Sequence, residues 1–190
     1  IGNSSRSLGR ALRGVESGYL SIAVVDGGAT AAPGVMKLAV AGQSIQSRPV
    51  VEVLPAGRRR GARSGFAVEF SDPFAGDVSV SAGDLLSASP DDEIAVSQAS
   101  GTDGNVEISV YSRVDIDPFG HITWGRQTTF PVFAANEIID GFAVTTDGAT
   151  VAVGPVTPTG NGIVAGSASG TPVVRVVDAT GVVVADWLTY

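Results

Sequence analysis

The sequence predicts an all-β protein built from three four-stranded antiparallel meanders, and three observations support this fold class. The composition is rich in Val, Ala and Gly, with 44% hydrophobic and 16% charged residues, as is typical of short strands and tight turns. Apolar and polar residues alternate in many short segments, as they do in strands that bury one face. The same order of four such segments occurs three times along the chain.

The first unit is predicted at residues 20–70, after an N-terminal arm at residues 1–19. Its four expected strands are, in order, "LSIAVVD", "MKLAVAG", "PVVEVL" and "GFAVEF". The arm is polar and carries arginines, and a short helix is expected at Leu8–Val15. Such a segment is expected to pack as an arm or to donate a strand to a neighbour.

The second unit is predicted at residues 73–133, with the strands "VSVSAGD", "DEIAVSQ", "VEISVYS" and "ITWGRQTTFPVF". Its first strand alternates most clearly, because Val78 and Val80 are interleaved with Ser79 and Ser81. The stretch "GTDGN" supplies the Gly and Asp residues that a tight hairpin needs for positive φ angles. We therefore expect a hairpin between the second and third strands.

The third unit is predicted at residues 142–190, with the strands "ATVAVGP", "NGIVAGS", "PVVRVVD" and "GVVVADWLTY". Its last two strands are separated by the turn sequence "DATG". Equivalent positions keep similar spacings: Leu38 to Ile94 is 56 positions, Val51 to Ile108 is 57, and Ile94 to Ile163 is 69. A four-stranded meander of this size is typical of a β-propeller blade, so the three units predict a β-propeller-like partial propeller or half-ring.

Two segments resemble a known type of repeat. The stretch Phe70–Ser112, "FSDPFAGDVSVSAGDLLSASPDDEIAVSQASGTDGNVEISVYS", resembles an FG-GAP or VCBS-type repeat, and so does Thr150–Tyr190. Residues 20–70 match the pattern more loosely. The resemblance implies a β-propeller protein that is secreted or displayed at the cell surface, so an extracellular or cell-surface location is expected.

Repeats of this type carry a calcium loop between their first two strands, because a hard cation takes six to eight oxygen ligands. The second unit keeps Asp84 and Asp92 at such positions, but Leu86 and Ala88 stand where further ligands would be expected. The first unit offers only Asp26, and the third has no acid in this loop. We therefore expect a vestigial loop and no bound calcium or other cofactor, with the second unit as the one place where calcium remains an alternative.

Three blades do not close a ring, because closed propellers have about four or more blades. The chain is therefore expected to be completed by another protein subunit, by further blades of the same polypeptide, or by stacking as an open array. The net charge of -7 argues against nucleic acid as a partner. The basic cluster "GRRRGARSG" is interpreted as a solvated loop, no apolar run is long enough to span a membrane, and the chain has no cysteines.

Few residues suggest catalysis. His121 is the only histidine, and Asp115 and Asp117 form one acidic pair while Asp91 and Asp92 form another. Acids of this kind in turns are usually structural, although two carboxylates also serve in glycosidic cleavage. Four aromatic residues on the outer strands are interpreted as packing between blades or as a platform for sugar or a partner protein: Tyr111, Trp124, Trp187 and Tyr190.

The sequence therefore favours a non-enzymatic, secreted or cell-surface module for binding and assembly, with no assigned catalytic residue. Its expected partners are protein, with carbohydrate as a further ligand class. The alternative is the incomplete propeller of an extracellular polysaccharide hydrolase or lyase, with catalytic residues expected in the turns or in sequence outside this chain. Two facing carboxylates near His121 or Asp117 would favour the enzyme, whereas a multimer would favour assembly.

Overall fold

The computed structural model describes residues 17–26, 36–43, 48–55, 64–86, 91–102, 104–116, 118, 122–157 and 160–189. Every regular element in these residues is a β-strand, which confirms the predicted all-β class. The helix expected at Leu8–Val15 lies outside the described residues. Within the described ranges, no helix is long and apolar enough to cross a membrane.

The first sheet contains four antiparallel strands in sequence order: β1 (Ser17–Asp26), β2 (Met36–Gln43), β3 (Pro49–Pro55) and β4 (Ser64–Ala67). Val51 and Val53 of β3 are buried on one face, while Glu52 lies between them on the other face. This alternation follows from the period of two along a strand. The sheet is therefore a meander, as predicted.

The second sheet has the same order with longer outer strands: β5 (Val78–Gly83), β6 (Glu93–Gln98), β7 (Val106–Ile116) and β8 (Ile122–Phe133). All six residues of β6 are buried, because this sheet has a neighbour on each face. Pro131 is tolerated in β8 because β8 is an edge strand, where a missing amide donor breaks no pairing on the open side.

The third sheet contains β11 (Ala149–Thr157), β12 (Gly160–Ser167), β13 (Val173–Val177) and β14 (Val183–Leu188), again in sequence order. Its last hairpin turns at "DATG", where Gly181 has a φ of 90°. The carboxylate of Asp178 accepts hydrogen bonds from the backbone amides of Thr180 and Val182 at 2.8 and 3.0 Å. The Asp and Gly residues of "DATG" therefore form the tight turn between β13 and β14, as predicted.

The prediction of three sheets is wrong by one, since the described residues form four. The fourth is a two-stranded ribbon of β9 (Ile138–Ile139) and β10 (Phe142–Ala143), in the stretch expected to connect the second and third units. Asp140 and Gly141 join its strands with φ values of 50° and 83°. Asp-Gly favours this tight turn, and the strands are too short to produce a visible alternation in the sequence.

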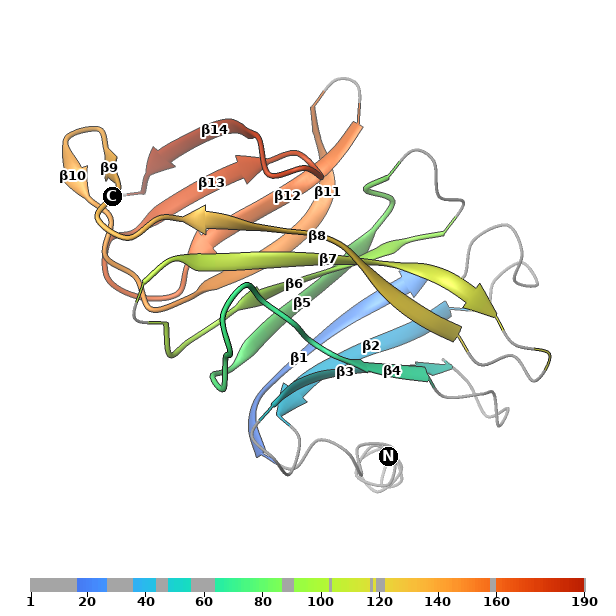
Figure 1. The fold of residues 1–190 in the computed structure, drawn as a ribbon. Coiled ribbons are helices and arrows are strands. Elements are labelled where there is room, and N and C mark those ends of the chain that lie inside the picture. The colour runs from blue at the N-terminus through green and yellow to red at the C-terminus, as the bar shows by residue number, and fades with distance from the viewer. Residues whose placement is uncertain are drawn as a thin grey trace, which may run out of the picture.

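The three four-stranded sheets are stacked in sequence order, with the second sheet in the middle (Figure 1). One hydrophobic core lies between the first and second sheets and includes Val51, Val53 and Ile94. The other lies between the second and third sheets and includes Ile108 and Ile163. Both faces of the middle sheet therefore line a core between sheets, and one face of each outer sheet does.

The first strands of neighbouring sheets are linked by serine side chains. The amide of Val80 in β5 donates to Ser21 Oγ of β1 at 3.0 Å. The amide of Val153 in β11 donates in the same way to Ser81 Oγ of β5 at 3.0 Å. Because each serine satisfies a backbone donor at the exposed edge of a strand, the sheets are held in a defined register as well as packed.

Candidate functional site

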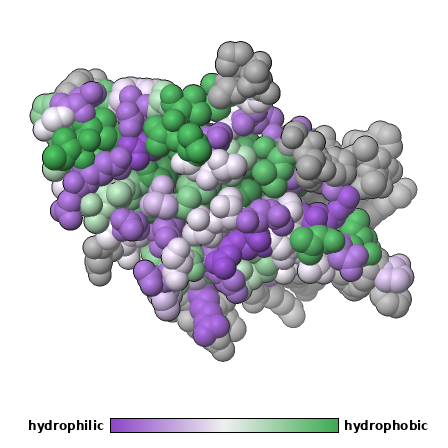
Figure 2. Space-filling model, turned by 45° about the horizontal axis from the view of Figure 1, so that its top comes forward, coloured by the Kyte–Doolittle hydropathy of each residue, from purple (hydrophilic) through white to green (hydrophobic). Residues whose placement is uncertain are grey.

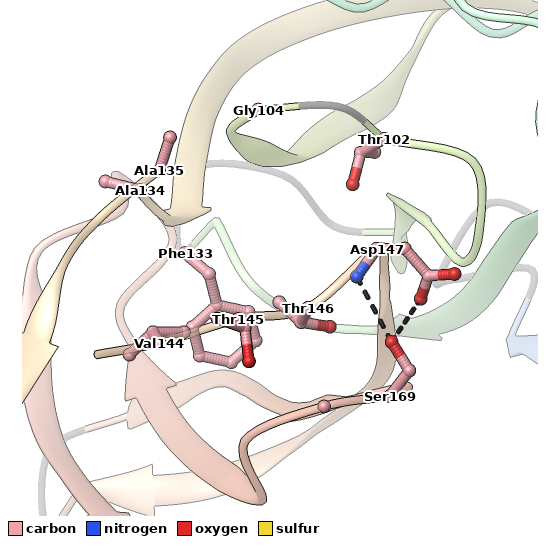
Figure 3. Close-up of a pocket in the computed structure, with 11 residues that line it drawn as sticks. Thr102, Gly104, Phe133, Ala134, Ala135, Val144, Thr145, Thr146, Asp147 and Ser169 are labelled. Atoms are coloured by element: carbon pink, nitrogen blue, oxygen red, sulfur yellow. Dashed lines mark hydrogen bonds between the residues drawn. The ribbon is translucent and has the colours of Figure 1, made fainter. Parts of the chain in front are cut away.

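A pocket of about 420 Å³ lies at one end of the second and third sheets, where several connections meet (Figure 3). Phe133 and Val144 lie together on one side of it, and Asp147 and Ser169 lie on the other. The complete lining is Thr102, Gly104, Phe133, Ala134, Ala135, Val144, Thr145, Thr146, Asp147, Ser169 and Gly170. The pocket therefore combines an apolar wall with hydroxyl groups and one carboxylate.

A repeated four-residue turn builds part of this pocket. The sequence Ala-Ser-Gly-Thr occurs at Ala99–Thr102 and again at Ala168–Thr171, each time after the second strand of a sheet. Ser100 Oγ donates to Asp77 at 3.1 Å, and Ser169 Oγ donates to Asp147. Each turn is thereby tied to an aspartate that lies one or two residues before the first strand of its own sheet.

Sequence reasoning missed this pair of turns, although a signal was present. The two copies are 69 positions apart, which is the spacing of Ile94 and Ile163. A glycine with positive φ lies in each copy, with values of 82° at Gly101 and 69° at Gly170. A residue other than glycine would be strained at these positions, so the repeated glycine marks a turn of defined geometry.

The pocket can hold a polar group but carries a single titratable side chain among its lining residues, Asp147. Thr102 Oγ1 is buried and makes no hydrogen bond within the described part of the chain. Glycosidic cleavage normally uses two carboxylates about 5–9.5 Å apart. The described lining therefore does not contain such a pair of carboxylates.

The predicted calcium positions lie at the hairpin between β5 and β6. Asp84 is exposed, and its carbonyl oxygen accepts a hydrogen bond from Asn161 Nδ2 of the third sheet at 2.6 Å. Asp92 is half-buried, and residues 87–90 lie outside the described ranges. Among the residues that the structure describes, no three His, Cys, Asp or Glu side chains gather as a metal site would require. The expectation of no calcium stays a prediction.

Two neighbouring acids have structural roles that the sequence did not reveal. The buried carboxylate of Glu93 accepts the backbone amides of Leu85 and Leu86 at 2.8 and 2.9 Å, which closes the hairpin. Asp91 is buried and forms an ion pair with Arg113 of β7. Both acids therefore have partners where loop meets sheet, although Glu93 Oε1 is buried without a hydrogen bond. Removing either acid would leave its partners without these contacts.

The remaining residues considered for chemistry do not come together in the described part of the chain. His121, Asp117, Tyr190 and the basic cluster at residues 58–63 lie outside it. Asp115 is exposed, and its carboxylate accepts the amide of the next residue, Ile116, at 2.8 Å. The described residues therefore show no pair of carboxylates at this hairpin.

The outer-strand aromatic residues divide into two groups. Tyr111 and Trp124 pack against Phe66 of the first sheet, with ring centroids 4.3 and 5.9 Å away. Burial raises the pKa of the Tyr111 hydroxyl, which accepts the amide of Glu69 at 2.7 Å. Trp187 of β14 is instead 44% exposed. The first group joins two sheets, whereas Trp187 is left on the surface.

The two outer faces of the stack carry large exposed apolar side chains. On the first sheet these are Ile22 and Val24 of β1, which are 50% and 48% exposed. On the third sheet the exposed side chain is that of Trp187 of β14, which pairs with Val174 of β13. Figure 2 turns the upper end of Figure 1 toward the viewer and shows hydrophobic surface gathered there. Exposed apolar patches of this kind mark interaction surfaces.

Comparison with known proteins gives no match: no family model, curated protein or solved structure matches the chain. The resemblance to FG-GAP and VCBS-type repeats therefore rests on the residues alone and stays a prediction. The architecture observed is that of stacked four-stranded antiparallel sheets.

Proposed function

We propose that this chain is a non-enzymatic assembly module whose stacked sheets are blades of a propeller-like ring completed by further blades. The observation that carries the proposal is the exposure of apolar side chains on both outer faces of the stack, Ile22 and Val24 at one end and Trp187 at the other. Both faces of the middle sheet line a core, and one face of each outer sheet does. On the outward face of the first sheet Val40 and Leu54 are buried, and the exposed apolar side chains are those of β1. Further sheets would remove the same kind of surface from water at both ends.

The arrangement of first strands supports a ring. β1, β5 and β11 are hydrogen-bonded from one sheet to the next by Ser21, Ser79 and Ser81. In a propeller, blades meet in this way around a central channel. A secreted or cell-surface location belongs to the proposal as well, and the resemblance to FG-GAP and VCBS-type repeats supports it.

The proposal is tested by charging both outer faces together. In the variant Ile22→Asp/Trp187→Asp, a carboxylate is placed on an edge strand of each outer face. The control Val114→Asp charges an apolar residue that is also exposed, at 56%, near the C-terminal end of β7. Association is followed by sedimentation velocity, and exposed apolar surface by the fluorescence of an apolar dye.

We expect the native chain to associate or to bind the dye, the double variant to lose that property, and the Val114→Asp control to keep it. A native chain that neither associates nor binds dye would contradict the proposal. The same is true of a double variant that behaves like the native chain.

A further inference from the structure

Each sheet has two faces, and we call the face toward the next sheet along the chain its far face and the opposite face its near face. In the third sheet, the far face is the one turned away from the second sheet. A row of four paired residues crosses each far face, one from each strand, in the order hydroxyl, small, β-branched, aromatic. The rows are Ser21–Ala41–Val51–Phe66, Ser79–Ser97–Ile108–Phe130 and Thr150–Gly166–Val174–Trp187. Equivalent register positions in three sheets therefore carry the same chemistry.

In the first two sheets this row is the centre of an interface. Val51 and Ile108 have no exposed surface. The hydroxyls accept amides from the first strand of the next sheet: Ser21 from Val80 at 3.0 Å, and Ser79 from Val151 at 3.4 Å. The row is therefore the part of a sheet that receives the next one.

In the third sheet the same row is uncovered. Thr150 is exposed, Gly166 and Val174 are half-buried, and Trp187 is 44% exposed. No described segment lies over Thr150 or donates a hydrogen bond to its hydroxyl. The third far face thus has the residues of an interface without the sheet that would cover them.

The near face of the first sheet is the matching half. By register, Ile22 is equivalent to Val80 and Val151, the residues that approach the hydroxyl of the preceding sheet. Val80 is 4% exposed, whereas Ile22 is 50% exposed. Val40, which pairs with Ile22, is buried at 1%, so the uncovered part of this face is centred on β1.

We propose that the occupant of the third far face is the first near face of a second copy of this chain, and that the two copies close a ring of six sheets. This inference rests on the proposed function and names its partner. It follows because one chain carries both unfilled halves of an interface that it already forms twice internally. In the interface, Thr150 Oγ1 accepts the backbone amide of Ile22 of the second copy, and Trp187 is covered.

The ring is consistent with the symmetry of such contacts. A far-to-near contact is head to tail, and two such contacts related by a two-fold axis close without leaving an open end. Two copies of three sheets make six blades, which lies within the range of about four to eight found in closed propellers. Both outer faces are then buried at once.

The test uses one variant for each half of the interface. Ile22→Asp blocks the near face and leaves the far face intact, while Trp187→Asp does the reverse. Both residues are exposed, so the folded chain tolerates the charge, and circular dichroism confirms folding; Thr150→Arg is a second far-face variant, and Val114→Asp is the matched control. Mass in solution is measured by light scattering on a sizing column.

We expect the native chain and Val114→Asp to have twice the mass of one chain, and each interface variant alone to have the mass of one. Burying an unpaired carboxylate raises the dissociation constant by at least about 100-fold.

Other outcomes overturn the inference. Dimers of Ile22→Asp alone would mean that the contact joins two identical faces, and native assemblies larger than two would mean an open array. If the native chain is a monomer that binds an apolar dye, and the double variant does not bind the dye, a second copy is not the partner. The proposed function would still stand in that case. A native monomer without dye binding overturns both.

Discussion

At the scale of single residues, the buried polar groups of this protein connect parts of the chain that lie far apart in sequence. Arg175 of β13 is 5% exposed and donates to Val132 O at 2.8 Å, to Glu137 at 2.7 Å and to Asp186 at 2.6 Å. Burial acts to lower its pKa, but Glu137 and Asp186 outweigh this effect and hold the pKa above its ordinary value. The guanidinium therefore stays charged and joins the second sheet, the connecting segment and the third sheet.

Replacing Arg175 with Met is expected to destabilise the protein by about 3 kcal/mol, because two acids lose their partner and a buried carbonyl loses its donor. The matched control is Arg126→Met, since Arg126 is exposed and lies 3.8 Å from Glu69. Exposed pairs contribute about 0–1 kcal/mol. Urea unfolding of both variants measures the difference, and equal losses would mean that the Arg175 network adds no stability.

The Asp178 turn predicts a dependence on pH. Although burial acts to raise the pKa of Asp178, hydrogen bonds from Thr180, Val182 and Gly181 lower it below its ordinary value. A lowered pKa in the folded state stabilises the fold above the unfolded pKa, and this contribution is lost as the pH falls through the folded pKa.

We therefore expect Asp178→Ala to cost about 1 kcal/mol near neutral pH, since exposed hydrogen bonds contribute modestly. The difference from the native protein should shrink as the pH is lowered from about 6 to about 2. Asp178→Asn, which does not titrate, should differ from Asp178→Ala by an amount independent of pH. Urea midpoints at several pH values test this, and a difference between native protein and Asp178→Ala that grows in acid would contradict it.

At the scale of elements, the turns decide how closely strands from different sheets approach. Gly170 has a φ of 69°, and a Cβ atom placed on it would lie 1.9 Å from Thr145 O. The hydroxyl groups of Thr145 and Thr171 are also hydrogen-bonded to each other, with their oxygens 3.0 Å apart. The segment that leads into β11 can therefore lie against this turn only because residue 170 has no side chain.

Gly170→Ala is expected to destabilise the protein by about 2–4 kcal/mol, because the backbone is strained and the segment at Thr145 must move. Gly160→Ala is the matched control in the same sheet, since a Cβ there meets no atom within 4 Å. Its effect should be within about 0.5 kcal/mol. Thermal unfolding of the two variants distinguishes them, and a harmless Gly170→Ala would show that the turn is not constrained as described.

At the scale of the whole molecule, each four-stranded sheet depends on a neighbouring sheet to bury its apolar side chains. The core between the first and second sheets and the core between the second and third sheets share the strands of the middle sheet. Loss of either outer sheet would expose residues such as Ile108 or Ile94, which have no exposed surface in the fold. The stack is therefore expected to unfold as one cooperative unit.

The two tryptophans provide separate probes of that cooperativity. Trp124 lies between the first and second sheets, and Trp187 lies on the third. In the single-tryptophan variants Trp124→Phe and Trp187→Phe, we expect the urea transitions followed by fluorescence and by circular dichroism to coincide within each variant. A fluorescence transition displaced from the circular dichroism transition would mean that one outer sheet unfolds independently.

Much of the local structure could be predicted from the sequence. The alternation at Val78–Ala82 identified a strand with two unlike faces, and "DATG" identified a hairpin, because side-chain direction and turn geometry depend only on neighbouring residues. The repeated order of segments indicated four-stranded meanders for the same reason. The ribbon at Ile138–Ala143 escaped prediction because two-residue strands are too short to show a period.

The candidate site was less predictable, since its residues are brought together by contacts across the fold. Glu93 stands in the expected strand "DEIAVSQ", and only the structure shows that its carboxylate accepts two backbone amides. Arg175 stands in the expected strand "PVVRVVD", and only the structure shows that it joins three segments. The sequence by itself determined the strands, their faces and their turns, because these depend on local geometry. Only the tertiary structure decided which faces meet and which remain uncovered, because burial is a property of the neighbours that a face acquires on folding.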